Sequence, residues 1–278
     1  MSNSPILILG ARGKTGRRVA DRLERLGRSI RTASRTGKTR FDFTDPTTWA
    51  SALAGVTTVY VVPMSGEQPA EPQAVQRFFK QAEESGARRM VLLSVRGPKG
   101  TPDPAQEPLE RALQKSSMQW TILRPSWFAQ NFSEGIFAED IRSGQLAAPA
   151  GDGHEAFIDV EDIADVATAA LIDERHAGKV YELSGPEGLS FETAVHKIAT
   201  ALGKPVQYLP VAPEKYVPMQ IAAGLPAEVA EVVAQLFDAI REGAGSYVSD
   251  GVRQALGREP RSFDAFVKDA IVTGAWKA

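Results

Sequence analysis

Three glycines stand near the N-terminus at a spacing of three residues, in the segment ILILGARGKTGRRVA. Gly10 follows a short aliphatic run and allows a sharp turn, because glycine adopts backbone conformations that other residues avoid. Gly13 has no side chain to keep a phosphate from the backbone, and Gly16 lets a helix pack close to a strand. The free N–H groups at the start of that helix would bind the pyrophosphate of a dinucleotide.

The next expected strand has no acidic residue near it, since none occurs between Glu24 and Asp42. A site that selects NAD usually ends this strand with Asp or Glu, which bonds the ribose 2′-hydroxyl. Here the segment IRTASR places Arg35 just past the strand end, where a guanidinium can bind a 2′-phosphate. Arg12, in the glycine turn, can hold it from the other side. The pattern predicts NADP(H), preferred over NAD(H), although some of these basic residues must only be solvated surface.

The usual proton donor of short-chain reductases is missing. These enzymes use Tyr-x-x-x-Lys, and none of the five tyrosines here has a lysine four residues later. Weak substitutes are Ser94, at the end of an expected strand, and the pair Gln106 and Glu110, one helical turn apart. Glu110 would have to be buried and protonated to act as an acid. The pattern instead favours Glu110 as an exposed helix residue or as a partner of Gln114 one turn later. The catalytic residues therefore stay unassigned.

Strands that alternate with helices must position these residues. Continuous apolar runs indicate strands covered on both faces, and amphipathic stretches between them indicate helices. Strands are expected at 6–9, 56–62, 90–95, 120–123 and 180–183, and helices at 15–26, 73–85 and 161–171. The alternation predicts a doubly wound parallel α/β sheet of the Rossmann type.

The last third of the chain changes character, because strands become scarce and helices are expected at 226–241 and 262–273. We therefore predict an NAD(P)-binding domain over 1–185, of which 126–155 contributes to the cleft. A smaller, mainly helical lobe on the substrate side follows over 186–278. The segment 98–108 holds four prolines in eleven residues and is a candidate flap.

Composition narrows the partners of the chain. Its 278 residues carry a formal net charge of −2, which gives no long-range attraction to nucleic acid. It has no cysteine, no histidine pattern with metal-ligand spacing and no apolar run long enough to span a bilayer. We expect a cytoplasmic protein with a small-molecule partner and no metal. Monomer and homodimer stay open.

Several motifs together identify a family. GARGKTG, RTASR, VLLSVRG, TILRPSWFAQNF and FIDVEDIADVATAAL resemble the NmrA-like atypical short-chain dehydrogenase/reductases from about residue 5 to the C-terminus. Within the family the chain is similar to bacterial relatives of festuclavine and agroclavine dehydrogenases and to the NADPH:quinone reductase branch. The resemblance implies a Rossmann domain, a smaller lobe, and NADP(H) contacts from Gly10, Arg12, Gly13, Lys14, Thr15, Gly16, Arg35, Val62, Pro63, Met64, Ser94 and Pro125.

Two different functions are compatible with the sequence. Trp127, Phe128 and Asn131 follow the sixth strand and could line a flat acceptor pocket, although packing is the better interpretation for Phe128. This favours a reductase that transfers hydride to a quinone, imine or enone, because such acceptors need little acid catalysis. The missing Tyr and Lys, and Gln106 where relatives often carry His, favour a non-catalytic NADP(H) sensor that acts through a protein partner.

Overall fold

The computed structural model describes residues 4–65, 68–98 and 100–277. These residues form two compact units. Unit 1 consists of the described part of Met1–Pro125 together with Val160–Leu183 and Asp250–Glu259. Unit 2 consists of Ser126–Asp159, Ser184–Ser249 and the described part of Pro260–Ala278.

A parallel sheet forms the centre of unit 1. In the described part of the chain it has seven strands, in the order β11-β8-β7-β4-β1-β2-β3. Their bounds are Ile6–Leu9 (β1), Ile30–Ser34 (β2), Thr39–Arg40 (β3), Thr58–Val61 (β4), Arg89–Leu93 (β7), Gln119–Pro125 (β8) and Lys179–Leu183 (β11). The chain proceeds from β1 to one side through β2 and to the other side through β4. In sheets of this kind ligands bind where the order reverses, at the carboxyl ends of the strands.

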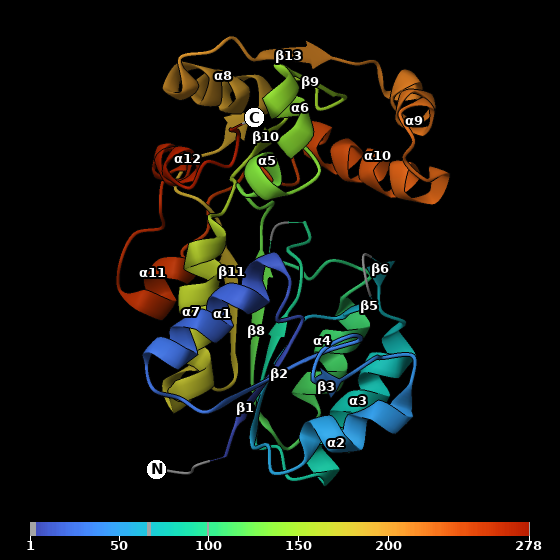
Figure 1. Cartoon of the computed structure of the whole chain (residues 1–278), viewed down its shortest axis with the longest axis vertical. Helices are drawn as coiled ribbons and strands as arrows, with labels where there is room; N and C mark the ends of the chain where they lie inside the picture. Colours follow the sequence, from blue (N-terminus) through green and yellow to red (C-terminus); the bar gives the residue numbers. More distant parts are fainter. Residues whose placement is uncertain (1–3, 66–67, 99, 278) are drawn as a thin grey trace. The chain divides into compact units, whose positions relative to one another are not determined.

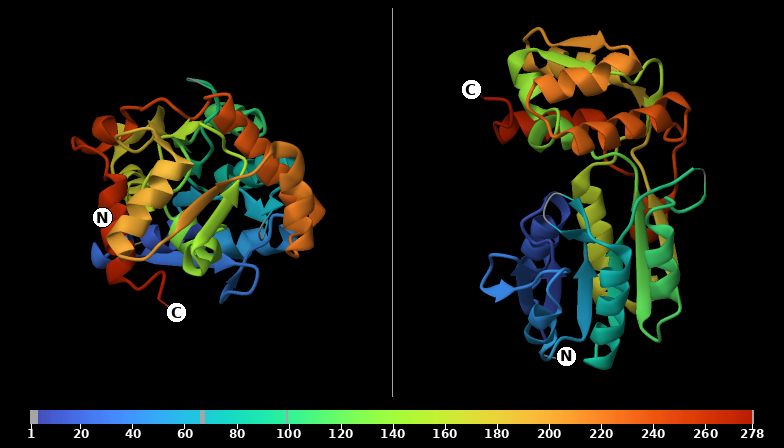
Figure 2. Two further views of the ribbon diagram at one scale, coloured as in Figure 1. Left: turned by 90° about the horizontal axis from the view of Figure 1, so that it is seen from above. Right: turned by 90° about the vertical axis from the view of Figure 1, so that its right-hand side faces the viewer.

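Helices cover both faces of this sheet, with α1 and α7 on one side and α2, α3 and α4 on the other (Figure 1 and Figure 2). On the second face Leu7, Val59 and Leu92 of the strands share a core with Trp49 and Phe78 of the helices. The helices are Lys14–Arg25 (α1), Trp49–Leu53 (α2), Pro72–Glu84 (α3), Glu107–Gln114 (α4), Val160–Ile172 (α7) and Gly251–Leu256 (α11). Short elements are the 3₁₀ helices Pro46–Thr48 (η1) and Glu174–His176 (η2) and the hairpin Met64–Ser65 (β5) and Gln68–Pro69 (β6).

Unit 2 is mainly helical and is built around an aromatic core. Phe191 lies at its centre, with ring centroids 5.3 to 5.8 Å from those of Phe132, Phe157 and Phe237. The helices are Asn131–Glu134 (α5), Ala138–Ser143 (α6), Phe191–Leu202 (α8), Pro213–Ala222 (α9), Ala227–Arg241 (α10) and Phe263–Val272 (α12). Two short strand pairs join Gln145–Ala148 (β9) to Gln207–Pro210 (β13) and His154–Glu155 (β10) to Leu189–Ser190 (β12).

The predicted Rossmann-type fold with its helical lobe is confirmed, and the expected strands and helices lie within a few residues of their predicted bounds. Helix α8 ends at Gly203, whose φ of 61° is left-handed. The division of the chain is more complex than one boundary after residue 185. Residues 126–159 belong to the compact unit of the helical lobe, and 250–259 return to the unit of the sheet.

Candidate coenzyme site

The glycine turn connects β1 to α1 at the point where the strand order reverses. Gly10 has a φ of 71°, and a Cβ atom there would lie 3.1 Å from the Cβ of Val62, just after β4. A Cβ on Gly16 would lie 2.2 Å from the carbonyl oxygen of Gly10, a distance that no side chain can occupy. The turn therefore depends on glycine, and it draws β1, α1 and the end of β4 close together.

The first turn of α1 is free of side chains that would compete with a phosphate. Gly13 is the N-cap residue and offers no side-chain cap, and no acidic residue occurs in the first turn. The N–H groups at this end are left without intrahelical acceptors and carry the positive end of the helix dipole. Burial, together with the charges of Arg17 and Arg18, lowers the pKa of Lys14. This end of α1 is thus suited to an anion, and the dinucleotide pyrophosphate fits it.

Thr15 contributes to this turn differently from its neighbours. Its side chain is buried and lies beside the hydroxyl of Tyr60 on β4. Burial raises the pKa of Tyr60, and the nearby Thr15 side chain opposes that shift only in part, since the Tyr60 hydroxyl has no hydrogen-bond partner among the described residues. The backbone amide is therefore the group that Thr15 can offer to a phosphate, and Tyr60 is too deeply buried to serve as a proton donor.

Basic side chains stand at the adjoining edge. β1 and β2 are parallel with Leu9 opposite Ala33, so the glycine turn and the residues after Ser34 leave the sheet side by side. Arg12 and Arg35 are both exposed. Arg12 donates to the hydroxyl of Thr36, and Arg35 has no polar partner among the described residues.

The resemblance also assigned contacts after β4. Val62 is half-buried against Gly10, Pro63 is buried, and Met64 is exposed where it begins the β5–β6 hairpin. Pro125 is the buried last residue of β8, paired with Leu183 of β11. These residues all lie at the carboxyl ends of the strands, as the glycine turn does.

Ser94 and Glu110 meet in a buried polar cluster. The Ser94 hydroxyl donates to Oε1 of Glu110 at 2.5 Å, and Arg124 of β8 binds both carboxylate oxygens, with Nη2 2.6 Å from Oε2. Glu110 is 2% exposed, so the expectation of an exposed helix residue is wrong. Four apolar neighbours in the strand WTILRP were the signal that Arg124 needs a buried partner.

Gln106 precedes this cluster as the N-cap residue of α4. Its side-chain oxygen is buried and has no hydrogen-bond partner in the described part of the chain. It lies one helical turn from Glu110, as expected, and its carbonyl accepts from the Glu110 N–H at 3.1 Å. Its side chain makes no hydrogen bond to Ser94 or Glu110 in the described part of the chain, and its role stays a prediction.

The three residues predicted to line an acceptor pocket belong to unit 2. Trp127 is half-buried and stacks on Phe137, with centroids 6.2 Å apart and planes at 8°. Phe128 forms an isolated β-bridge with Ile158, and Asn131 begins α5. Trp127 and Phe128 both keep some exposed surface, so the structure leaves them available for a ligand as well as for packing.

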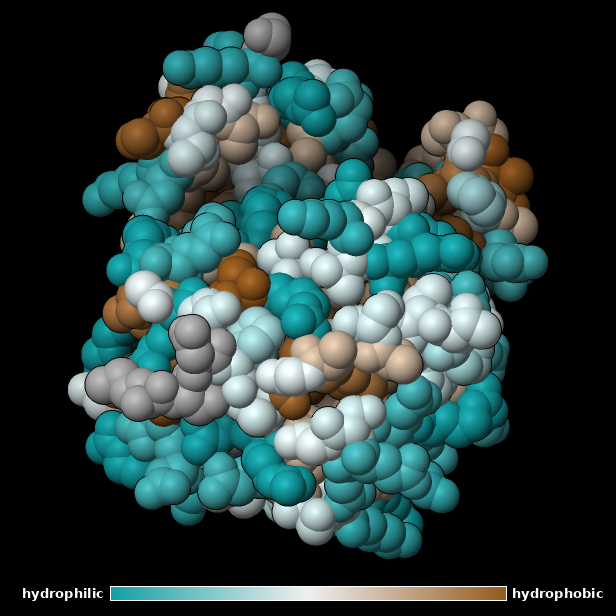
Figure 3. Space-filling model, turned by 60° about the horizontal axis from the view of Figure 1, so that its bottom comes forward, coloured by the Kyte–Doolittle hydropathy of each residue, from teal (hydrophilic) through white to brown (hydrophobic). Residues whose placement is uncertain are grey.

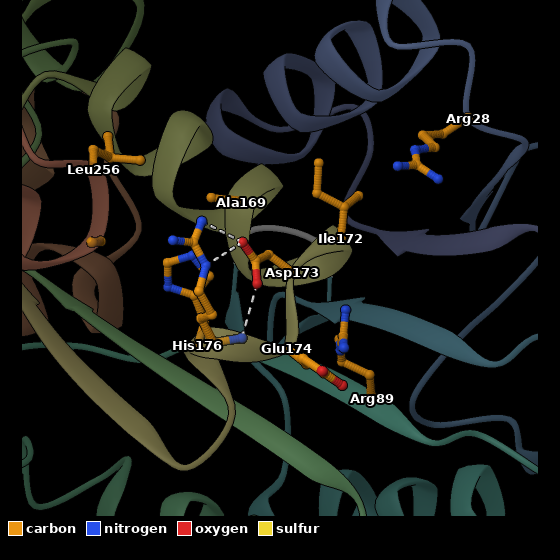
Figure 4. Close-up of a pocket in the computed structure, with 10 residues that line it drawn as sticks. Arg28, Arg89, Ala169, Ile172, Asp173, Glu174, His176 and Leu256 are labelled. Atoms are coloured by element: carbon orange, nitrogen blue, oxygen red, sulfur yellow. Dashed lines mark hydrogen bonds and ion pairs between the residues drawn. The ribbon is translucent and has the colours of Figure 1, made fainter. Parts of the chain in front are cut away.

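A separate hollow of about 660 Å³ lies at the opposite ends of the strands in unit 1 (Figure 4). It is lined by Arg28, which precedes β2, by Arg89, the first residue of β7, and by the η2 residues. His176 is buried there beside the hydroxyl of Tyr181, and burial lowers its pKa. None of the predicted site residues lies in this hollow.

Comparison with known proteins decides the family. Residues 105–267 match the family described as NmrA-like, and residues 10–174 match the family described as NAD(P)H-binding. The chain belongs to the NmrA-like family. Its recognition from sequence motifs is therefore confirmed, and so is its assignment to the NAD(P)H-dependent oxidoreductases.

Curated relatives of this NmrA-like chain cover nearly its whole length. An uncharacterised oxidoreductase, YesF of Bacillus subtilis, is 35% identical over 96% of this chain and 95% of its own. Agroclavine dehydrogenase of Claviceps fusiformis is 30% identical over 95% and 96%. Among solved structures, the NADPH complex of quinone oxidoreductase QOR2 from Escherichia coli has a TM-score of 0.79 at 22% identity, with 96% and 99% covered. At 22% identity this structural match shows that the two proteins share a fold.

Two further findings concern the described residues only. No group of three or more His, Asp or Glu side chains there is arranged to hold a metal ion. None of the helices there combines the length and the apolar character that crossing a bilayer requires.

The face of the molecule drawn in Figure 3 is mainly hydrophilic, with hydrophobic residues in small separate groups.

Proposed function

We propose that this NmrA-like chain is an NADPH-dependent reductase that transfers hydride to a small, electron-poor acceptor such as a quinone, an imine or an enone. The observation that carries the proposal is the glycine turn, where a Cβ on Gly16 would strike Gly10, next to an uncapped helix start. Two exposed arginines, Arg12 and Arg35, stand beside it where an NAD site would carry a carboxylate.

The chain's own groups would hold the coenzyme by its phosphates. The backbone amides of Gly13 to Gly16 and the ammonium of Lys14 would bind the pyrophosphate, and Arg12 and Arg35 the 2′-phosphate. Gly10 leaves room at the end of β1, while Val62, Pro63 and Met64 after β4 and Ser94 and Pro125 after the next strands would border the rest of the coenzyme. The positive charges of both arginines attract the negatively charged phosphate.

A bound dihydronicotinamide supplies hydride from its C4 atom. The side chains near it do not supply a proton: the Ser94 hydroxyl already donates to Glu110, and Glu110 is held by Arg124. An iminium acceptor needs no proton, because its nitrogen loses its positive charge as the C–H bond forms. A quinone becomes a phenolate that takes its proton from water. The protein would act by positioning the reactants.

Trp127, Phe128 and Asn131 are the residues we propose for the acceptor pocket. Their rings offer flat apolar surface and the amide offers one donor and one acceptor, which suits a planar substrate. The names of two relatives, agroclavine dehydrogenase and quinone oxidoreductase, support acceptors of this kind.

The acceptor proposal is tested with pure protein, NADPH and a panel of quinones, cyclic imines and enones. We expect loss of the 340 nm absorbance of NADPH at a rate that saturates with at least one acceptor. Tight NADPH binding without turnover on any acceptor would overturn the reductase and favour the sensor. No binding of either dinucleotide would overturn the coenzyme site itself.

Replacement of Arg35 tests the coenzyme preference. Arg35→Glu places a negative charge beside the 2′-phosphate. It should weaken the binding of NADPH on the order of a hundredfold, while the affinity for NADH changes little. Arg28→Glu is the matched control, because Arg28 lies in the hollow at the opposite ends of the strands. Dissociation constants measured by fluorescence decide the matter, and equal losses for NADPH and NADH would show that Arg35 does not contact the 2′-phosphate.

A further inference from the structure

Thr36 is the polar partner of Arg12 among the described residues. The Arg12 Nη1 group donates to the Thr36 hydroxyl, across 24 positions of sequence. Both side chains are exposed, and Arg12 makes no other hydrogen bond or ion pair in the described part of the chain. The contact therefore joins the glycine turn after β1 to the segment after β2.

The segment after β2 is a tight turn that fixes where Thr36 lies. The Gly37 N–H donates to the Ser34 carbonyl at 3.4 Å, and the Phe41 N–H donates to the same oxygen at 3.0 Å. A Cβ on Gly37 would lie 2.7 Å from the Ser34 hydroxyl oxygen, so the chain wraps closely around that side chain. Arg35 and Thr36 are consecutive residues at the apex of this turn.

The charges around Thr36 are unbalanced in favour of an anion. The nearest acidic residues in sequence are engaged elsewhere: Asp42 accepts from Thr44 at 2.9 Å, and Asp45 pairs with Arg40 at 3.2 Å. Two guanidinium groups without a carboxylate partner match the charge of a phosphate monoester, which is close to −2 near neutral pH.

We propose that Thr36 determines coenzyme specificity, because it holds Arg12 in place and donates its own hydrogen to the 2′-phosphate. The inference rests on the NADPH preference proposed above. The hydroxyl oxygen accepts from Arg12, so its hydrogen remains available for a second bond. Without the hydroxyl, Arg12 loses its tether and must be ordered when the coenzyme binds, which weakens binding.

The experiment compares Thr36→Val, which keeps the shape and removes the hydroxyl, with Thr36→Ser, which keeps the hydroxyl. The dissociation constants of NADP⁺ and NAD⁺ are measured by calorimetry on the full chain. We expect Thr36→Val to weaken NADP⁺ by about tenfold with NAD⁺ unchanged, a loss typical of one charge-assisted hydrogen bond. Thr36→Ser should stay within about twofold of the wild type. Thr32→Val, at an exposed threonine on β2 itself, is the matched control.

A double-mutant cycle with Arg12→Ala tests whether Thr36 acts through Arg12. We expect the loss caused by Thr36→Val to shrink when Arg12 is absent, whereas additive losses would overturn the positioning role. An unchanged NADP⁺/NAD⁺ ratio in Thr36→Val, or equal losses for both coenzymes, would overturn the specificity role alone. A wild-type protein that binds NADP⁺ and NAD⁺ equally would instead overturn the proposed NADPH preference.

Discussion

At the scale of single residues, Ser94 and Glu110 were candidates for catalysis and the structure ties them to each other. Glu110 accepts from Ser94 and, through both oxygens, from Arg124. Both carboxylate oxygens of Glu110 therefore act as hydrogen-bond acceptors within the cluster. Ser94 can then act on a ligand only through its lone pairs.

Removal of the Glu110 carboxylate should destabilise the protein strongly. Glu110→Ala removes the nearer carboxylate of Arg124, whose side chain is 10% exposed, and leaves it only the more distant Glu182 at 3.8 Å, so we expect a loss of about 2–4 kcal/mol in the free energy of unfolding. Glu107→Ala is the control on the same helix, because Glu107 pairs with Arg111 in solvent and should cost below about 1 kcal/mol. Urea unfolding measures both, and similar small losses would contradict a stabilising role for the cluster.

Sequence patterns named the candidate site residues but not the side chains that these residues contact. The spacing of Gly10, Gly13 and Gly16 predicts a turn because backbone geometry alone demands it. The contacts of Glu110 with Arg124 and of Arg12 with Thr36 join residues far apart in the chain. Such contacts depend on strand order and register, which a single sequence does not specify at side-chain resolution.

At the scale of elements, the β1–α1 unit separates two roles of glycine. Gly16 is buried against the turn, where a Cβ would lie 2.2 Å from a carbonyl oxygen. Gly13 is exposed, and a Cβ there would lie 3.3 Å from the same oxygen, which a small shift relieves. One glycine therefore serves packing and the other serves access to the helix N–H groups.

Alanine substitutions distinguish these roles. Gly16→Ala should push α1 away from β1 and reduce both the free energy of unfolding, by about 2 kcal/mol, and NADPH binding. Gly13→Ala should leave stability within about 1 kcal/mol and weaken NADPH by tenfold or so, because its methyl group stands where the phosphate approaches. Thermal unfolding and fluorescence titration give the two quantities. Equal stability losses for the two variants would contradict the distinction.

The positions of helices and strands could be predicted from the sequence, but the division of the chain into its two compact units could not. Continuous apolar strands and amphipathic helices leave a local signal, so β1, β4, β7 and α1 could be placed from the sequence. α11 has six residues, and its segment belongs to unit 1 through contacts with α7 and β11. A short helix of this kind carries no periodicity that would reveal its distant partners.

At the scale of the whole molecule, the chain leaves unit 1 after Leu183 and returns to it at Asp250. An ionic network holds this returning segment within the unit. Arg258 contacts Asp162 at 2.7 Å and Asp165 at 2.6 Å on α7, and Asp165 also binds Arg22 of α1 at 2.6 Å. Asp162 has no exposed side-chain surface, and Arg258 supplies a counter-charge to its buried carboxylate.

Arg258→Ala tests whether the return is held by this network. It leaves a buried carboxylate without its guanidinium, and we expect the free energy of unfolding to fall by about 2–4 kcal/mol. Arg253→Ala is the matched control, since Arg253 pairs with Glu259 while both side chains are more than half exposed, and it should cost below about 1 kcal/mol. Helix α1 follows the glycine turn, and its Arg22 shares Asp165 with Arg258. Arg258→Ala should therefore also lower the affinity for NADPH when it is measured at urea concentrations below the unfolding midpoint. If urea unfolding gave Arg253→Ala and Arg258→Ala the same stability, the returning segment would be held by apolar packing and not by its charges.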